Sequence, residues 1–195
     1  MTNTLPKIIV ARHGQTEWAV TGQHTGRTDI PLTAAGEDEA RSLGERIGKR
    51  SFAAVFTSPS QRARRTADLA GYGEAVVDDD LAEWDYGQYE GLLTTEIEAR
   101  KPGWNIFTDG CPDGESAAQM TARAERVVNR LRDLNADALI FTSGHIARCI
   151  APRWIGQPIT LGVFLLISTA SLSVLGYDHQ RNEPAISKWN ETGRD

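Results

Sequence analysis

The chain has 195 residues, 40% of them hydrophobic and 24% charged, which is enough for a domain with a full hydrophobic core. Lys and Arg number 21 against 26 Asp and Glu, so the net charge is −5. This acidic balance argues against nucleic acid or an anionic membrane surface as the main partner. Any anionic ligand must therefore be held by a local group of positive charges.

Predicted strands and helices alternate along the chain. Apolar, β-branched runs predict strands at 7–11, 53–57, 75–78 and 138–143, with closing strands at 171–177 and 185–189. Amphipathic or capped segments predict helices after Thr33, after Pro59 to about Ala70, over 116–134, and from Gly144 to about Ile155. Thr33 is the expected N-cap of the first of these helices.

This alternation predicts one α/β domain over residues 1–195, a three-layer sandwich with a mostly parallel central sheet flanked by helices. Ligands of such sheets bind at the carboxyl ends of the strands. Polar segments follow three of the predicted strands, at 12–13, 58–65 and 143–148. We expect these three segments to converge at one edge of the sheet.

Several classes of protein are not expected. The N-terminal sequence "MTNTLPK" lacks the layout of a secretory signal, and the longest apolar run, 161–167, is too short to span a bilayer. We therefore expect a cytoplasmic protein with no membrane partner. Whether the 161–167 run is core or a homodimer interface stays open. The histidines and cysteines show neither HxxxH nor CxxC spacing, so no structural metal or disulfide framework is expected.

The segment "IIVARHGQTEW" (8–18) ends a strand on residues suited to phosphoryl chemistry, which needs fixed cations, a nucleophile and a proton donor. Arg12 and Arg62 offer forked donors that match phosphate oxygens. His13 is the candidate nucleophile, because nearby guanidinium groups would disfavour its protonated form. Gly14 would let the backbone approach an oxyanion without a Cβ in the way.

Glu83 is the candidate proton donor to the leaving oxygen. Partial burial against Trp84 and Tyr86 would raise its pKa toward that task. Taken singly, each candidate has a simpler structural explanation: a polar turn at 12–14, a solvated arginine face on the helix after Pro59, a loop carboxylate, or packing aromatics. His24 and His179 are expected to be surface or structural histidines.

Four segments occurring together favour a functional interpretation. They are "RHGQTEW" (12–18), "TGRTDIPLTAAG" (25–36), "TSPSQRARRTA" (57–67) and "LAEWDYGQYEG" (81–91). In this order the chain resembles the histidine phosphatase superfamily, which includes the phosphoglycerate mutases, from about Lys7 to Arg148. The segments "AEWDYGQYEG" and "DGCPDGES" (109–116) are similar to the branch with sedoheptulose-1,7-bisphosphatase-like and broad-specificity acid phosphatases.

The resemblance implies that His13 is transiently phosphorylated, that Arg12 and Arg62 bind the phosphate, and that Glu83 is the general acid that later activates water. The candidate substrate- and phosphate-binding residues are Gly14, Gln15, Thr25, Gly26, Ser143, Gly144 and His145. No metal or cofactor is implied, and the expected partner is a small phosphorylated metabolite. Residues 104, 107, 109 and 113 are expected to bear on specificity.

One departure from the family pattern falls at a catalytic position. The family presents a second histidine in a Ser-His-Gly pattern, with an arginine five residues beyond that histidine. Here "FTSGHIAR" places Ser143 at that position and His145 two residues later. The missing imidazole would supply roughly 2–4 kcal/mol of transition-state stabilisation.

Three interpretations of this departure stay open. Ser143 binds the phosphoryl group more weakly, His145 takes over the missing role, or the protein binds phosphorylated ligands without efficient turnover. We favour retained activity, since a binding protein has no need for both His13 and Glu83. The mutases also have an asparagine where this chain has Ala19. They carry a longer insertion with an Arg-Arg pair that binds a second phosphate, whereas the nearest basic pair here is Arg100-Lys101.

A shorter insertion leaves a phosphohistidine open to water, so hydrolysis is favoured over transfer back to the substrate. The expected function is hydrolysis of a sugar phosphate or bisphosphate. The alternatives are a 2,3-bisphosphoglycerate-dependent mutase and a phosphometabolite-binding protein.

Overall fold

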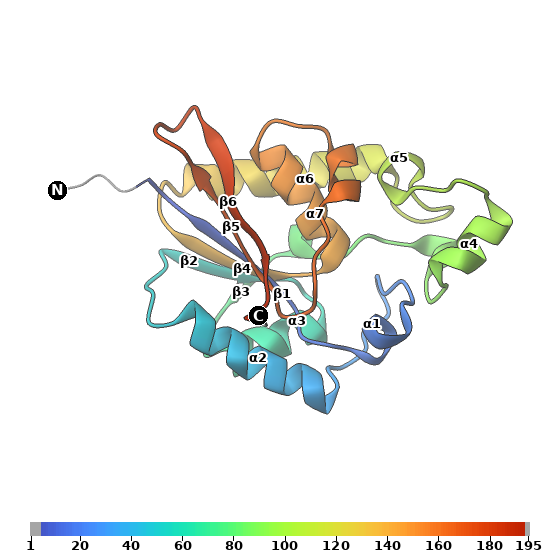
Figure 1. The fold of residues 1–195 in the computed structure, drawn as a ribbon, viewed down its shortest axis with the longest axis horizontal. Coiled ribbons are helices and arrows are strands. Elements are labelled where there is room, and N and C mark those ends of the chain that lie inside the picture. Colours follow the sequence, from blue (N-terminus) through green and yellow to red (C-terminus); the bar gives the residue numbers. More distant parts are fainter. Residues whose placement is uncertain (1–4, 194–195) are drawn as a thin grey trace.

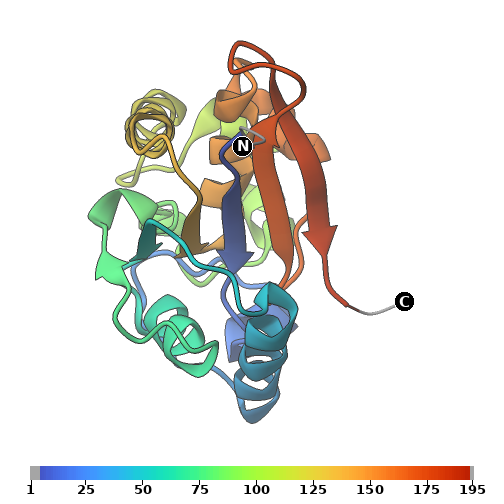
Figure 2. The same cartoon turned by 90° about the vertical axis from the view of Figure 1, so that its left-hand side faces the viewer.

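The computed structural model describes residues 5–193 and is built around a six-stranded sheet with the order β3-β2-β4-β1-β5-β6 (Figure 1). The strands are β1 (Ile8–Arg12), β2 (Ala54–Thr57), β3 (Val76–Val77), β4 (Ala138–Thr142), β5 (Leu172–Tyr177) and β6 (Pro184–Glu191). The first four are parallel to one another, whereas β5 pairs antiparallel with β1 and with β6. Figure 2 shows β1 inside the sheet and β5 and β6 together on one side of it.

The helices include all four that the sequence predicts. They are α1 (Glu17–Thr21), α2 (Ala34–Ile47), α3 (Gln61–Leu69), α4 (Thr94–Arg100), α5 (Ile106–Asp109), α6 (Ala117–Asp133) and α7 (Gly144–Trp154), with 3₁₀ turns η1 (Asp79–Leu81), η2 (Gly87–Tyr89) and η3 (Ile159–Phe164). Thr33 caps α2 as expected, accepting a hydrogen bond from the Gly36 N–H at 3.0 Å. No helix within residues 5–193 is long and apolar enough to cross a membrane.

Alternation of side chains along the central strands creates two buried cores. Ile8 and Val10 of β1 pack in a cluster with the apolar faces of α6 and α7. Ile9 and Ala11 of the same strand pack in a second cluster with Leu43 and other residues of α2 and α3. The buried strands are apolar on both faces because helices cover both. The predicted three-layer α/β fold with a mostly parallel sheet is confirmed.

The carboxyl ends of the central strands meet, as the topology predicts. The His13 N–H donates to the Thr142 carbonyl at 3.0 Å, and the Ser58 N–H donates to the Phe141 carbonyl at 2.8 Å. The loop after β1 is thus tied to the end of β4, and so is the loop after β2. All three polar segments that follow these strands therefore reach one edge of the sheet.

The apolar run at 161–167 is only partly core. Ile167 packs against the main hydrophobic cluster, whereas Phe164 and Leu166 are 78% and 72% exposed. The two cysteines, Cys111 and Cys149, are buried and free.

Candidate active site

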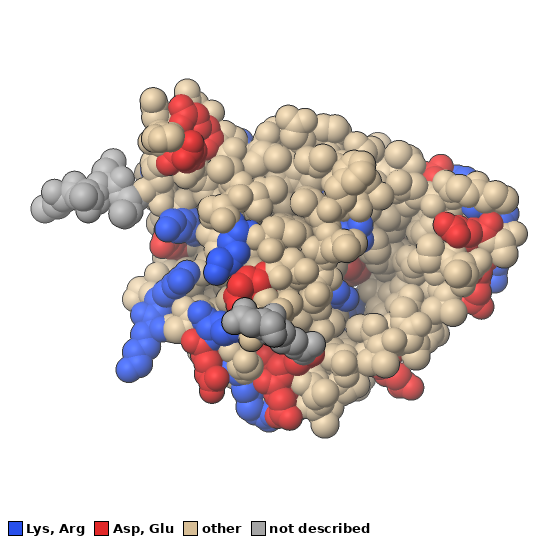
Figure 3. All heavy atoms as spheres, viewed as in Figure 1, with Lys and Arg blue, Asp and Glu red and all other residues tan. Residues whose placement is uncertain are grey.

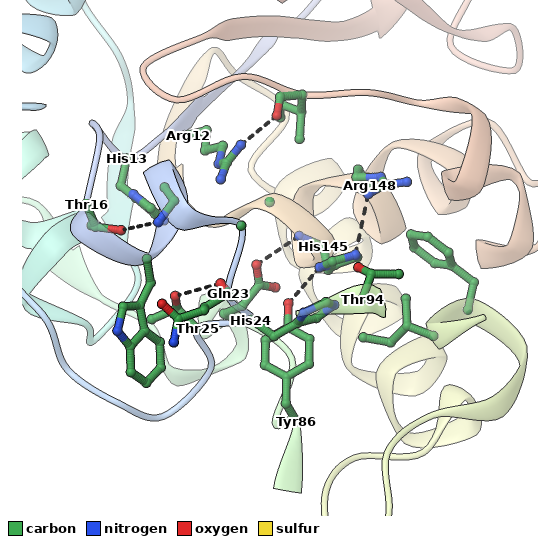
Figure 4. A pocket seen from close by; sticks show the side chains of 18 of the residues that line it. Arg12, His13, Thr16, Gln23, His24, Thr25, Tyr86, Thr94, His145 and Arg148 are labelled. Atoms are coloured by element: carbon green, nitrogen blue, oxygen red, sulfur yellow. Dashed lines mark hydrogen bonds between the residues drawn. The ribbon is translucent and has the colours of Figure 1, made fainter. Parts of the chain in front are cut away.

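A pocket of about 430 Å³ opens at the carboxyl edge of the sheet. Six of the predicted site residues line it, namely Arg12, His13, Thr25, Glu83, Gly144 and His145. The space-filling view shows this face hollowed between α1 and α4 (Figure 3). Figure 4 shows Arg12 and His13 on one side of the pocket, with Tyr86, His145 and Arg148 on the other.

His13 is held in one tautomer with its other nitrogen available. The side chain is only 5% exposed, and its Nδ1 lies 2.7 Å from the Gly14 carbonyl oxygen. A carbonyl can only accept, so Nδ1 carries the proton and Nε2 keeps a lone pair. Burial, followed by the charges of Arg62 and Arg12, holds the pKa of His13 well below its usual value. This neutral imidazole is suited to nucleophilic attack through Nε2.

Two arginines flank the nucleophile, the buried Arg62 and the half-buried Arg12. Arg12 donates from one terminal nitrogen to the Ile167 carbonyl at 2.6 Å. Arg62, on α3, donates to the carbonyls of Thr25, Gly26 and Thr28 at 3.0–3.1 Å. The Nε atoms of both arginines are buried without a hydrogen-bond partner. Arg12 lines the pocket and is suited to bind an anionic oxygen of a ligand, whereas Arg62 does not line it and acts on His13 through its charge.

Gly14 is required for packing, which differs from the reason expected from the sequence. A Cβ on Gly14 would lie 2.2 Å from the backbone oxygen of Gly36 in α2. The Gly14 N–H also donates to Thr66 Oγ1 at 3.0 Å. The absence of a side chain therefore lets the loop after β1 lie directly against α2, and this contact fixes the backbone next to His13.

We expect Gly14→Ala to destabilise the protein by about 3 kcal/mol, because the added methyl group must push the loop after β1 away from α2. The measurement is the free energy of unfolding in urea. Gly71→Ala serves as the comparison, because a Cβ there meets nothing within 4 Å, although its positive φ adds strain. Equal stability losses in the two variants would contradict the packing role of Gly14.

Glu83 connects the loop after η1 to the start of α7. Its carboxylate accepts the N–H groups of Trp84, His145 and Ile146 at 2.8–2.9 Å. A Cβ on Gly144 would lie 3.5 Å from Arg12 Nε and 3.7 Å from Glu83 Oε2, so both side chains border the same small space. Glu83 therefore performs the capping role at this helix start, where a carboxylate also faces the positive end of the helix dipole.

Ser143 occupies the N-cap position of α7 but makes no capping hydrogen bond. Its side chain is fully buried, at 0% exposure, and its Oγ has no hydrogen-bond partner. The residue follows β4 directly, next to the loop that carries His13. A buried hydroxyl without a partner costs about 1–3 kcal/mol, and a bound anion at this edge would remove that cost.

The far side of the pocket is rich in aromatic rings and hydrogen-bonding groups. Trp104 and Phe107 line it together with His24, Tyr86 and Arg148. His24 was expected to be a surface or structural histidine, and it makes structural contacts but also lines the pocket. Its ring stacks on His145 with centroids 5.9 Å apart, and its Nδ1 lies 3.0 Å from the Leu92 carbonyl. The neighbouring Thr25 and Gly26 were assigned to the pocket, and that adjacency was the available signal for His24.

The remaining predicted residues lie behind or beside the pocket. Gln15 faces α2, where its side-chain oxygen accepts the Thr33 hydroxyl at 2.9 Å, and its N–H donates to Glu39 at 2.8 Å. Gly26 and Glu83 both line a second pocket of about 550 Å³. Of the residues expected to bear on specificity, 109 and 113 are engaged outside the main pocket, in contacts with Lys101 and Gln88.

A metal-binding group occurs away from the pocket. Within residues 5–193, the one group of three His, Cys, Asp or Glu side chains close enough to share an ion is Asp178, His179 and Glu183. These residues lie at the turn between β5 and β6, and Asp178 and His179 are exposed. Exposed clusters of this type occur often without an ion. The candidate nucleophile is flanked by arginines, which are not metal ligands.

The fold and the site define an α/β protein whose parallel sheet presents a buried neutral histidine between two arginines. The chain belongs to the histidine phosphatase superfamily (branch 1), whose family model matches residues 8–192. It is 38% identical over 184 residues to an acid phosphatase of Mycobacterium tuberculosis, covering 92% of this chain and 91% of that protein. It is 39% identical over 189 residues to sedoheptulose 1,7-bisphosphatase of Saccharomyces cerevisiae, covering 80% and 70%.

Solved structures agree with this assignment. The product of the open reading frame Rv3214 of Mycobacterium tuberculosis is 36% identical and has a TM-score of 0.92, with 97% of this chain and 99% of that chain covered. A mycobacterial glucosyl-3-phosphoglycerate phosphatase has a TM-score of 0.82 at 23% identity, covering 96% of this chain and all of the other, which shows a shared fold. The predicted family is therefore confirmed.

Proposed function

We propose that the protein is a phosphomonoesterase that acts through a phosphohistidine at His13. The observation that carries this proposal is the neutral His13, with Nδ1–H held by the Gly14 carbonyl and Nε2 free, beside Arg12 and Arg62. In the reaction, Nε2 attacks phosphorus and the bond to the ester oxygen breaks. Glu83 supplies the proton to the leaving oxygen, and water then attacks the phosphohistidine to release phosphate.

The arginines would carry the electrostatic part of the catalysis. In the transition state, negative charge is spread over the three equatorial oxygens of the transferred phosphoryl group. Arg12 lines the pocket and would donate to these oxygens, Arg62 adds positive charge beside His13, and both guanidinium groups are anchored on backbone carbonyls. Because the donors are fixed before the substrate binds, little reorganisation is needed in the transition state. No metal ion has a required part in this mechanism.

We propose a phosphorylated sugar as the substrate class. Two observations support it: the similarity to a sedoheptulose 1,7-bisphosphatase, and the far side of the pocket. Among the described lining residues, Arg148 is the one Lys or Arg beyond Arg12. Aromatic rings, imidazoles and hydroxyl groups make up much of the remaining surface, and such groups hydrogen-bond hydroxyls and pack against a carbon skeleton.

The function is tested by phosphate release from p-nitrophenyl phosphate and ribose 5-phosphate in the presence of EDTA. We expect turnover of both, with the exposed His179→Gln variant as a matched control of unchanged activity. Formation of an isomerised phosphoester that depends on a bisphosphate primer would instead support a mutase. Tight binding of ribose 5-phosphate with no phosphate release would support a binding protein whose site is weakened at Ser143.

The pH dependence of turnover should report the lowered pKa of His13. The nucleophile is the neutral ring, and burial and the two arginines hold its pKa well below 6.5. Lowering the pKa keeps the ring neutral at more acidic pH, so we expect activity to persist below pH 6.5 on the acid side. The measurement is kcat/KM against pH, corrected for the ionisation of the substrate phosphate. An acidic limb centred above pH 6.5 would contradict a neutral His13 nucleophile.

A further inference from the structure

His145 has a partner on each ring nitrogen. Its Nδ1 lies 2.6 Å from the Tyr86 hydroxyl oxygen, and its Nε2 lies 3.4 Å from a terminal nitrogen of Arg148 (Figure 4). Tyr86 comes from the loop that carries Glu83, whereas His145 and Arg148 lie one turn apart on α7. All three side chains line the main pocket.

The two partners together select one tautomer of His145. A guanidinium group has only donors, so Nε2 can meet Arg148 favourably only through its lone pair. A neutral imidazole has a single proton, which must then be on Nδ1. The opposite tautomer would point two N–H groups at each other. Burial, reinforced by the Arg148 charge, holds the pKa of His145 well below its usual value, so the ring is neutral.

This tautomer sets the direction of the Tyr86 hydroxyl proton. If Nδ1–H donates to the Tyr86 oxygen, the hydroxyl proton cannot also point at His145 and must turn elsewhere. Arg148 is itself held in place, because its Nε donates to the Gly162 carbonyl at 2.9 Å and its guanidinium lies over the Phe107 ring, 4.9 Å from the centroid. The contacts Arg148–His145–Tyr86 therefore leave the O–H of Tyr86, a residue that lines the pocket, available to donate to another group.

We propose that His145 is a positioning residue that acts through Tyr86, turning its hydroxyl toward an oxygen on the carbon next to the phosphoester. The enzyme would then favour phosphate esters with a neighbouring hydroxyl. The inference rests on the proposed function, since Tyr86 shares the pocket with the proton donor Glu83, whose carboxylate accepts the backbone N–H of the same His145 at 2.9 Å. Burial raises the pKa of Tyr86 well above its usual value, so the hydroxyl keeps its proton.

The tautomer is measured on the unliganded protein. Long-range ¹H–¹⁵N correlation spectra of histidine-labelled protein distinguish Nδ1–H from Nε2–H rings, and the His145 signals are those lost in His145→Gln. We expect the Nδ1–H pattern at neutral pH. The exposed His179→Gln variant should remove a different set of signals. An Nε2–H or doubly protonated His145 would overturn the proposal.

The effect on substrate choice is measured with glycerol 1-phosphate and propyl phosphate, which differ only in hydroxyl groups. We expect the parent to favour glycerol 1-phosphate about tenfold in kcat/KM, and Tyr86→Phe and His145→Gln each to lose this preference. The double variant should be no worse than Tyr86→Phe, because both changes break one chain of contacts. His145→Asn, whose amide reaches the place of Nδ1, should restore most of the preference.

Additive losses in the double variant, or a preference that survives Tyr86→Phe, would overturn the proposal. A failure of the proposed function would give a different set of results. In that case neither ester releases phosphate in the parent protein, while the tautomer of His145 in the unliganded protein still decides whether the chain of contacts exists.

Discussion

Replacing His13 by alanine is expected to reduce phosphate release by about 10⁴-fold or more, because the variant lacks the imidazole nitrogen that attacks phosphorus in the proposed mechanism. The His13 ring is buried with Nδ1 on the Gly14 carbonyl, so its loss removes the one atom that the mechanism requires to attack phosphorus. The measurement is steady-state turnover of p-nitrophenyl phosphate by purified parent and variant in EDTA.

The matched control for this variant is His24→Ala. His24 lines the same pocket and likewise has Nδ1 on a backbone carbonyl, but it is not flanked by the arginines. We expect His24→Ala to change KM more than kcat. Equal residual turnover in His13→Ala and the parent would show that another nucleophile, such as water, attacks the ester directly.

Replacing Ser143 by histidine is expected to raise kcat by about 10²-fold. The residue follows β4 next to the loop carrying His13, at the position where the family places its second histidine. An imidazole there would add a donor to the phosphoryl oxygens, and one such donor typically changes kcat by about 10²–10³-fold. The measurement is kcat for p-nitrophenyl phosphate, with the melting temperature recorded to confirm that the variant folds.

Ser143→Ala separates the contribution of the present hydroxyl. Its Oγ is buried without a partner, so its removal should stabilise the unliganded protein by about 1 kcal/mol while lowering turnover. A folded Ser143→His protein with unchanged kcat would contradict the view that the missing imidazole limits the rate. It would leave the arginines and Glu83 as sufficient for phosphoryl transfer.

The sheet and the long helices are predictable from local patterns. Buried parallel strands such as β4 are continuous apolar runs. The N-cap residue Thr33 and the apolar stripe that follows it predict α2. The short helix α1, with five residues, and α5, with four residues, are too short to show a helical period. Each begins at a side-chain N-cap, Thr16 for α1 and Asn105 for α5, but a single cap residue without a helical period does not predict a helix.

The candidate site divides in the same way. Arg12, His13 and Glu83 belong to compact motifs and lie together in the pocket as predicted. The contact between Tyr86 and His145 joins residues 59 positions apart, so neither residue signals the other in the sequence. Packing of the loop after η1 against the start of α7, where Glu83 accepts the N–H groups of His145 and Ile146, creates it.

Some features of the site cannot be predicted from the sequence, because they depend on which groups each residue contacts in the fold. Gly14 was expected to make room for an oxyanion, but in the structure a Cβ at this position would clash with the backbone of α2. Gln15 belongs to the same motif as His13 but turns toward α2. Motif membership therefore predicts proximity to the site, while the contacts decide which side chains face the substrate.

The most direct test of the mechanism is to trap the phosphorylated enzyme. Parent protein is mixed with excess p-nitrophenyl phosphate in EDTA, quenched in base within the first turnovers, and digested for mass spectrometry. The phosphohistidine mechanism predicts a single base-stable, acid-labile phosphoryl group on the peptide that contains His13, absent from His13→Ala. Rapid phosphate release with no phosphorylated peptide, or with the phosphoryl group on another residue, would contradict it.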